Sequence, residues 1–276
     1  MNIEGNQLNL AEIKKIQLGA LKYVKEICQK NNIDYYLMSG TLLGAVKYKG
    51  YIPWDDDIDI ALKRKDYLKL IKLINDDNSD DYKILSIYNT KDYYYLFAKL
   101  VSKKTKLIEN AKEIKEMGVY IDIFPLDYYN DNYEKYINKI KFIKRLATNR
   151  YRVINPINKT TNKDNIKVRK SKIKKIILNV IDFISLPLGY NFWAKLYDKL
   201  ISKNKSGKYI TRGGKYKAKF EKELFDESLE YEFEKEMFTS IKNADTLLKA
   251  VYGDYTKDLP KEKQRTHHQM KAYWRN

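Results

Sequence analysis

Cysteine and histidine are nearly absent from this chain of 276 residues, which contains one cysteine, Cys28, and two histidines, His267 and His268. A single cysteine excludes an intramolecular disulfide and a zinc site built from several thiolates, and it fits a reducing compartment. Two histidines exclude a three-histidine metal site. No apolar run approaches the roughly 20 residues that cross a bilayer, and the N-terminus lacks an apolar core of signal-peptide length. We therefore expect the chain in the cytoplasm.

Basic residues outnumber acidic ones, with 54 Lys and Arg against 36 Asp and Glu and a formal net charge of +18. Such an excess indicates an anionic partner, such as nucleic acid, a lipid surface or a phosphorylated substrate. A lysine-rich composition alone explains it equally well. Nucleic acid is the least favoured partner, because the basic residues are spread along the chain without a recognised binding motif. We expect no nucleic acid.

Helix and strand patterns alternate over the first 128 residues. Apolar residues recur at steps of three and four over 8–31, which predicts a helix, and further helices are predicted over 41–50 and 63–76. Strands are predicted over 33–40, 57–63, 82–88, 93–101 and 119–129, and the strand at 57–63 is expected to have one buried face. The later chain predicts helices over 130–154 and 176–203, and strands or loops over 207–227 joined at Gly213-Gly214. These patterns predict an α/β (α+β) fold with a helical, basic second half.

An acidic cluster, GYIPWDDDIDIAL, holds four aspartates within residues 55–59. Like charges this close repel, so the cluster costs stability unless a cation sits among them. The pleat of a strand puts Asp55, Asp57 and Asp59 on one side, where carboxylates suit a hard divalent cation. We expect Mg²⁺, with Mn²⁺ as an alternative. The competing interpretations are a solvated acidic loop, which the apolar neighbours oppose, and a helix cap, which needs only one aspartate.

Two further segments complete a pattern around these acids. Ser39, Gly40 and Thr41 join a predicted strand to a helix, where free backbone N–H groups can bind a phosphate. A simple turn glycine is the alternative for Gly40. Asp122 lies in the apolar segment VYIDIFPLD and is costly to bury without a partner, which a metal would supply; capping of a neighbouring backbone is the alternative. A phosphate-side turn, an Asp-x-Asp strand and a later acid are typical of a nucleotidyltransferase-like mixed sheet with flanking helices.

These segments resemble the LicD family, which is related to the fukutin-type ribitol-phosphate transferases. The resemblance rests on SGTLLGAVKYKGYIPWDDDIDIAL, FAKLV, YIDIFPLD and YGDYTKDLPKEKQRTHH, so it covers the first 128 residues and, more loosely, the last 25 or so. It implies transfer of a phospho-alcohol, most often phosphocholine, from CDP-choline or another CDP-alcohol to a hydroxyl of a cell-surface glycan or its lipid-linked precursor. It implies metal ligation by Asp55, Asp57, Asp59 and Asp122, catalytic roles for the last three, and phosphate contacts from Ser39, Gly40, Thr41 and Lys99. Asp122 could act as general base or only as a metal ligand.

The resemblance also divides the chain into a catalytic core over 1–128 and an acceptor-side region over 129–276, whose C-terminal segment returns to the core. A choline group would be held by aromatic faces, for which Trp54 and Tyr93–Tyr95 are candidates. His267 and His268 lie in the family-like tail, where an idle or structural role is the more common one. The alternative function is nucleotide transfer from a nucleoside triphosphate donor.

A basic run, Lys163 to Lys175, precedes an apolar stretch. This combination predicts that residues 163–185 make peripheral contact with the anionic inner face of the cell membrane. A solvated helix face followed by a core helix is the alternative.

Overall fold

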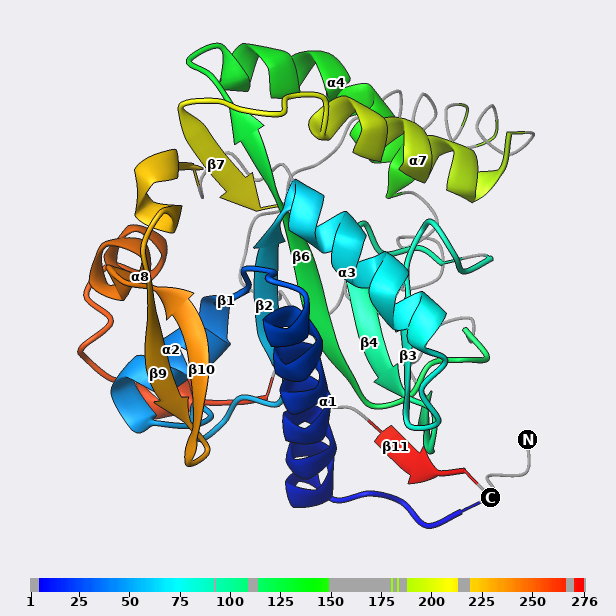
Figure 1. Cartoon of the computed structure of the whole chain (residues 1–276), viewed down its shortest axis with the longest axis vertical. Helices are drawn as coiled ribbons and strands as arrows, with labels where there is room; N and C mark the ends of the chain where they lie inside the picture. The colour runs from blue at the N-terminus through cyan, green and yellow to red at the C-terminus, as the bar shows by residue number, and fades with distance from the viewer. Residues whose placement is uncertain are drawn as a thin grey trace.

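The computed structural model describes residues 5–91, 93–108, 114–148, 180, 183, 188–212, 219–266 and 271–275. A mixed sheet occupies the middle of the molecule (Figure 1). The helices in these residues are α1 (Leu10–Lys30), α2 (Ser39–Tyr48), α3 (Arg64–Asp77), α4 (Tyr133–Ala147), α7 (Gly189–Ile201), α8 (Ala244–Tyr252) and the 3₁₀ turns Lys222–Phe225 and Lys261–Lys263. The strands are β1 (Tyr36–Leu37), β2 (Asp59–Lys63), β3 (Tyr82–Leu85), β4 (Ala98–Ser102), β5 (Thr105–Ile108), β6 (Tyr120–Tyr129), β7 (Tyr209–Arg212), β8 (Lys219–Glu221), β9 (Ser228–Phe233), β10 (Glu236–Ile241) and β11 (Lys271–Trp274).

The central sheet follows the order β1-β2-β6-β4-β3, and β7 and β8 continue it from β6. β2 and β6 are parallel, whereas the other neighbouring strands are antiparallel. Helices α1 and α3 pack on the sheet and against each other, in front of the sheet in Figure 1. The predicted mixed sheet with flanking helices is therefore confirmed.

Helix α1 begins where the sequence provides a cap. The side chain of Asn9 accepts a hydrogen bond from the backbone N–H of Glu12, and the Glu12 carboxylate accepts one from the backbone N–H of Asn9. This reciprocal pair satisfies two of the N–H groups that a helix start leaves free. Ile13 and Val24 then bury the apolar face, so the helix predicted over 8–31 is confirmed.

Strand β6 has two successive partners along one edge. β4 pairs with residues 120–123 and β7 with residues 126–129, so the two strands meet on either side of Pro125. The N–H of Asp122 donates to Ile58 on the opposite, β2 side. Because backbone groups alternate along a strand, the nitrogen of Pro125 points to the junction between β4 and β7. Proline lacks an N–H, so it fits inside the strand where no partner needs that donor.

Helices α4 and α7 form a layer at one end of the molecule (Figure 1). They share an apolar cluster that includes Tyr133, Ile137 and Tyr197. The helices predicted over 130–154 and 176–203 are thus confirmed, within the described residues, as α4 and α7. No helix in the described part of the chain is long and apolar enough to cross a membrane. The basic run at 163–175 and the two histidines lie outside the described residues.

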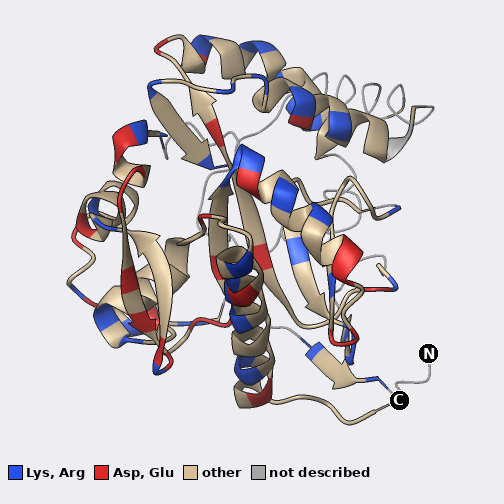
Figure 2. Cartoon of the chain, viewed as in Figure 1, with Lys and Arg blue, Asp and Glu red and all other residues tan. Residues whose placement is uncertain are grey.

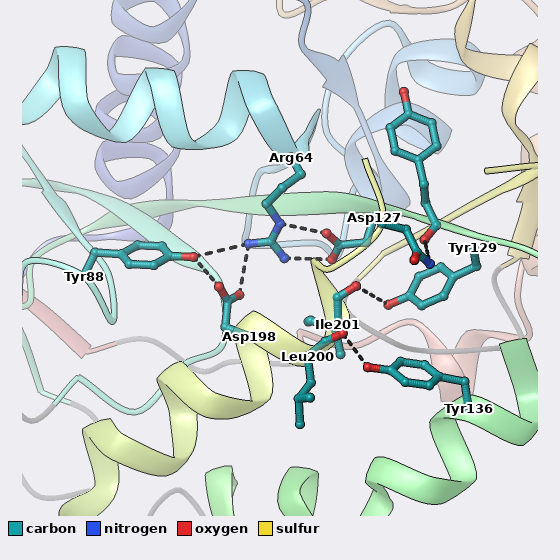
Figure 3. Close-up of polar contacts among 10 residues, drawn as sticks. Arg64, Tyr88, Asp127, Tyr129, Tyr136, Asp198, Leu200 and Ile201 are labelled. Atoms are coloured by element: carbon teal, nitrogen blue, oxygen red, sulfur yellow. Dashed lines mark hydrogen bonds and ion pairs between the residues drawn. The ribbon is translucent and has the colours of Figure 1, made fainter. Parts of the chain in front are cut away.

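An arginine attaches this layer to the core (Figure 3). Arg64, at the start of α3, donates two hydrogen bonds of 2.7 Å to the carboxylate of Asp127 on β6. Its third nitrogen lies 3.0 Å from Asp198 on α7, which also accepts a hydrogen bond from Tyr88. The three charged residues are nearly excluded from solvent. One cation therefore binds two carboxylates that come from the sheet and from α7.

Some predictions about strands were wrong. β2 was expected to have one buried face, but Ala61 and Leu62, which point in opposite directions, are both fully buried because the sheet is covered on both sides there. Residues 93–95 were expected within a strand, yet β4 begins only at Ala98. Strands or loops were predicted over 207–227, and the structure shows the antiparallel strand pair β7–β8 there, whose joint lies outside the described residues.

Two strand pairs in the structure were not predicted. β9 and β10 form a hairpin, and β11 near the C-terminus pairs with β5. The hairpin had a signal that the sequence analysis overlooked, because Leu229, Tyr231 and Phe233 alternate with Glu230 and Glu232 as in a strand with one polar face. The β5–β11 pair joins segments that are far apart in the sequence, a contact that no local pattern indicates.

Candidate active site

Three predicted site residues lie side by side on neighbouring strands. Asp59 on β2 is the register partner of Asp122 on β6, and Asp122 is also the partner of Lys99 on β4. Paired residues share one face of a sheet, and Lys99 Nζ lies 2.6 Å from Asp122 Oδ1. The two side chains are only 2% and 9% exposed. The ammonium group therefore stabilises a buried carboxylate that would otherwise be costly.

The predicted phosphate-side turn lies directly beside this row. Thr41 Oγ1 accepts a hydrogen bond of 2.8 Å from the backbone N–H of Asp59. Helix α2 begins at Ser39, and its N-cap, Met38, supplies no side-chain acceptor to the first N–H groups. A Cβ atom on Gly40 would lie 2.3 Å from Asp55 Oδ2. The glycine therefore lets an aspartate of the acidic cluster approach the helix start closely.

Arg212, at the end of β7, is a site residue that sequence analysis missed. Its guanidinium lies 3.2 Å from Asp59 Oδ2 and donates a hydrogen bond to Ser39 Oγ. The same group sits 4.2 Å from the ring centre of Phe124, the residue next to the β4–β7 junction. Arg212 thus connects the phosphate-side turn to the acids. Its signal in the sequence was a basic residue that closes the strand segment YITR before two glycines.

Crowding of the carboxylates changes their protonation. Burial, together with the charges of Asp57 and Asp122, raises the pKa of Asp59 to about 7, although Arg212 opposes the shift. Burial and the neighbouring Asp57 also raise the pKa of Asp55 to about 7. The site therefore holds more negative charge than its protein partners neutralise, and a bound cation would stabilise it.

Tyr252, at the end of α8, is a second residue that sequence analysis did not single out. Desolvation and the charge of Asp59 raise the pKa of its phenol. Further contributions come from Asp55 and Asp57. The negative charges of these acids therefore act on the phenol of Tyr252.

The described residues supply only some of the ligands that a divalent metal ion needs. Within the described residues, no three Asp, Glu, His or Cys side chains converge to enclose a metal ion by themselves. Mg²⁺ does not need such an enclosure, because it usually takes one or two carboxylates and completes its shell with water and substrate phosphates. Asp57 and Asp59 supply two carboxylates, whereas Asp122 is engaged by Lys99. The four-aspartate ligand set stays a prediction.

The aromatic residues predicted to hold choline lie in different surroundings. Trp54 packs edge-on against Tyr48, with ring centres 6.5 Å apart, and is half-buried. Tyr93 and Tyr94 are buried in the core. The ring of Tyr95 lies 4.4 Å from Lys99 Nζ and already holds a cation. Trp54 is therefore the candidate that remains available beside the acidic cluster.

The fold and the site together define a nucleotidyltransferase-type domain: a mixed sheet, a helix start beside an Asp-x-Asp strand, and a third acid on the adjacent strand. Comparison with known families agrees, since residues 32–163 match the model described as "LicD/FKTN/FKRP, nucleotidyltransferase domain". All the predicted site residues fall inside this match. Residues 32–163 therefore resemble the nucleotidyltransferase domain of the LicD family.

Similarity to one relative extends over nearly the whole chain. The "Lipopolysaccharide cholinephosphotransferase LicD" of Haemophilus influenzae is 29% identical over 278 residues, which covers 97% of this chain and 98% of the relative. An uncharacterized protein of Rickettsia typhi is 31% identical over 134 residues, covering 48% of this chain and 41% of its own length. Another, from Rickettsia prowazekii, is 46% identical over 54 residues, which is 20% of each chain.

Two glycines of α2 allow a matched test of the site geometry. We expect Gly40→Ala to fold but to lose at least about tenfold in turnover, because the new Cβ would displace the Asp55 carboxylate. At Gly44 the new Cβ would meet the backbone oxygen of Gly50 at 2.3 Å, so Gly44→Ala should instead lower stability. Thermal unfolding and donor turnover of both variants separate the two effects. Full turnover in Gly40→Ala would show that the position of Asp55 is unimportant.

Proposed function

We propose that this chain transfers phosphocholine from a CDP-activated donor to a hydroxyl of a cell-surface glycan or its lipid-linked precursor. The observation that carries the proposal is the similarity to a cholinephosphotransferase over 97% of the chain and 98% of the relative. It extends beyond the family domain, so it includes the region after residue 163 as well as the acids. CDP-choline is the proposed donor, with another CDP-alcohol as the alternative.

The reaction needs one bond to form and one to break. The oxygen of the acceptor hydroxyl bonds to the phosphorus that carries the alcohol, while the bond from this phosphorus to the bridging oxygen breaks and CMP leaves. The hydroxyl proton passes to a carboxylate of the site. Asp122 is salt-bridged to Lys99 and nearly buried, so we assign it to positioning. Asp55, which is partly exposed, accepts the proton. Most of the rate enhancement comes from orientation and charge stabilisation.

The donor pyrophosphate requires positive charge and hydrogen-bond donors. In this proposal the start of α2 offers the N–H groups of Ser39, Gly40 and Thr41, and Arg212 offers a guanidinium at the same place. Asp57 and Asp59 would hold Mg²⁺ or Mn²⁺, which neutralises charge on the leaving phosphate when bound. Lys99 acts through Asp122 in this arrangement, since its ammonium is buried against that carboxylate and the ring of Tyr120.

The choline group of the donor would require aromatic faces near the acids. Trp54 adjoins Asp55 in the sequence and is half-buried, and the charges of the same acids raise the pKa of the Tyr252 phenol. Aromatic rings attract a quaternary ammonium ion through cation–π interactions. These two residues are our candidates for the contact.

Arg212 gives a direct test of donor binding. We expect Arg212→Ala to weaken donor binding by about tenfold or more, because a hydrogen bond between charged groups contributes about 1.5–3 kcal/mol. Arg212→Lys keeps the charge but loses the planar fork, so an intermediate affinity is expected. Calorimetric titration with CDP-choline measures both. Equal affinity in all three proteins would exclude Arg212 from the donor site.

Donor turnover tests the function as a whole. The protein is incubated with Mg²⁺ and CDP-choline, CDP-ribitol, CDP-glycerol, CDP-ethanolamine, CTP or ATP, and products are identified by mass. CMP release from CDP-choline, lost in Asp57→Ala, is the expected result. Pyrophosphate release from a triphosphate would instead favour the alternative suggested by the description of the family, a nucleotidyltransferase that transfers a nucleotide.

A further inference from the structure

The α4–α7 layer exposes large apolar side chains on its solvent side. Phe142 on α4 is 50% exposed and Phe192 on α7 is 46% exposed. Leu188, one turn before Phe192, is 54% exposed. Both helices pack against each other through their opposite faces, where Ile137 and Tyr197 lie in a common cluster. Exposed phenylalanines on adjacent helices are unusual on a soluble surface unless the surface binds a partner.

Lysines occupy the same stripes as these phenylalanines. On α4, Lys135 and Lys139 precede Phe142 by seven and three residues, a spacing that places all three on one side of a helix. On α7, Lys195 and Lys199 follow Phe192 by three and seven residues. We name this surface the α4–α7 face and define it by the exposed residues Lys135, Lys139, Phe142, Phe192, Lys195 and Lys199.

Acidic groups scarcely counter this charge. The acids of the two helices are Glu134 and Asp198, and Asp198 is buried against Arg64 on the side toward the sheet. Figure 2 shows lysine and arginine along both helices at this end of the molecule. The face is therefore cationic with apolar side chains among the charges, which is the pattern of a helix that lies in a membrane interface.

We infer that the α4–α7 face docks on an anionic phospholipid surface. The lysines would approach lipid phosphates, while Phe142 and Phe192 enter the headgroup region. A second copy of the chain fits less well, because the same face would bring lysines against lysines. Single-stranded nucleic acid is also bound by aromatic and basic residues, but such sites favour planar groups that stack, and the charges here are all lysines. The inference goes beyond the proposed transfer reaction and does not depend on it.

Vesicle binding tests this interface without any donor or acceptor. The full chain is sedimented with vesicles of phosphatidylcholine, with or without phosphatidylglycerol, at low and high salt. We expect binding only to the anionic vesicles, weakened by salt. Lys139→Gln with Lys195→Gln should weaken binding about 30-fold, since each basic residue near an anionic bilayer contributes about 1 kcal/mol. Phe142→Ser with Phe192→Ser should weaken it about tenfold or more.

Matched controls lie on other surfaces of the molecule. Lys15 and Lys30 are exposed lysines on α1, and Leu229 on β9 is 52% exposed. Lys15→Gln with Lys30→Gln, and Leu229→Ser, should leave vesicle binding unchanged. Absence of binding to anionic vesicles at low salt would overturn the inference. So would binding that the face variants do not reduce, a monomer–dimer change caused by the phenylalanine variants, or binding of single-stranded RNA through this face without binding of vesicles.

Discussion

Replacement of Asp59 by asparagine is expected to abolish transfer and yet to leave the protein at least as stable as the wild type. The carboxylate stands beside Asp122 in register and within hydrogen-bond reach of Arg212. In the proposed function this charge binds a metal ion or orients the donor, so its removal should reduce turnover at least about a hundredfold. The same charge is unfavourable in the folded protein, because burial and Asp57 raise the pKa of Asp59 despite Arg212. Asparagine keeps the shape and removes this repulsion.

For Asp59→Asn we expect two results. CMP release is lost, and the midpoint of urea unfolding at pH 8 is unchanged or raised. A folded-state pKa above the unfolded value means that ionisation of Asp59 opposes folding above the unfolded pKa, so the neutral variant gains most at high pH. Asp34→Asn, at an exposed position away from the site, serves as the control and should change neither quantity. Near-normal turnover in Asp59→Asn would remove this residue from the reaction.

Loss of Arg64 is expected to destabilise the whole protein. Its guanidinium bridges Asp127 on β6 and Asp198 on α7, and it is drawn at the centre of Figure 3. Arg64→Met would leave two carboxylates buried without their cation, which costs about 3–5 kcal/mol. For a chain of this size that corresponds to a melting temperature lower by about 10 °C. Thermal and urea unfolding measure the loss.

Two further variants show whether charge compensation is the cause. Arg64→Lys keeps the charge but cannot donate two parallel hydrogen bonds to Asp127, so it should fall between the wild type and Arg64→Met. Combining Arg64→Met with Asp127→Leu and Asp198→Leu removes all three charges and should recover much of the stability. If the triple variant were as unstable as Arg64→Met, packing rather than charge would explain the loss.

The acids and the turn were predictable from the sequence because their residue types are unusual in the segments that contain them. Aspartates within apolar strands, such as Asp59 and Asp122, need a reason to be there, and a glycine between a strand and a helix suggests close approach of a ligand. Their mutual arrangement also follows from strand pairing. The structure brings Asp59, Asp122 and Lys99 onto one face of three strands, although their chemical roles remain predictions.

Arg212 was not predictable in the same way, because a basic residue at the end of a strand segment is a weak signal among 54 Lys and Arg. It reaches Asp59 across 153 positions of sequence. That contact depends on β7 joining β6 beyond the end of β4, which no periodicity reveals. The link between Arg64 and Asp198 spans 134 positions for the same reason. The predictable features were polar residues in apolar segments, which are visible in the local sequence. The unpredictable features were contacts between residues that only the strand topology brings together.

The pairing of Tyr129 with Tyr209 has a consequence for how this scaffold can vary. The chain leaves the sheet at the end of β6 and re-enters it at the facing position of β7, so residues 130–208 form, in topological terms, the loop of a β-hairpin. The length of such a loop has little influence on the closure of its two ends. The segment can therefore change in length between the two tyrosines without shifting the register that aligns Asp59 with Asp122, as long as Asp198 keeps its contact with Arg64.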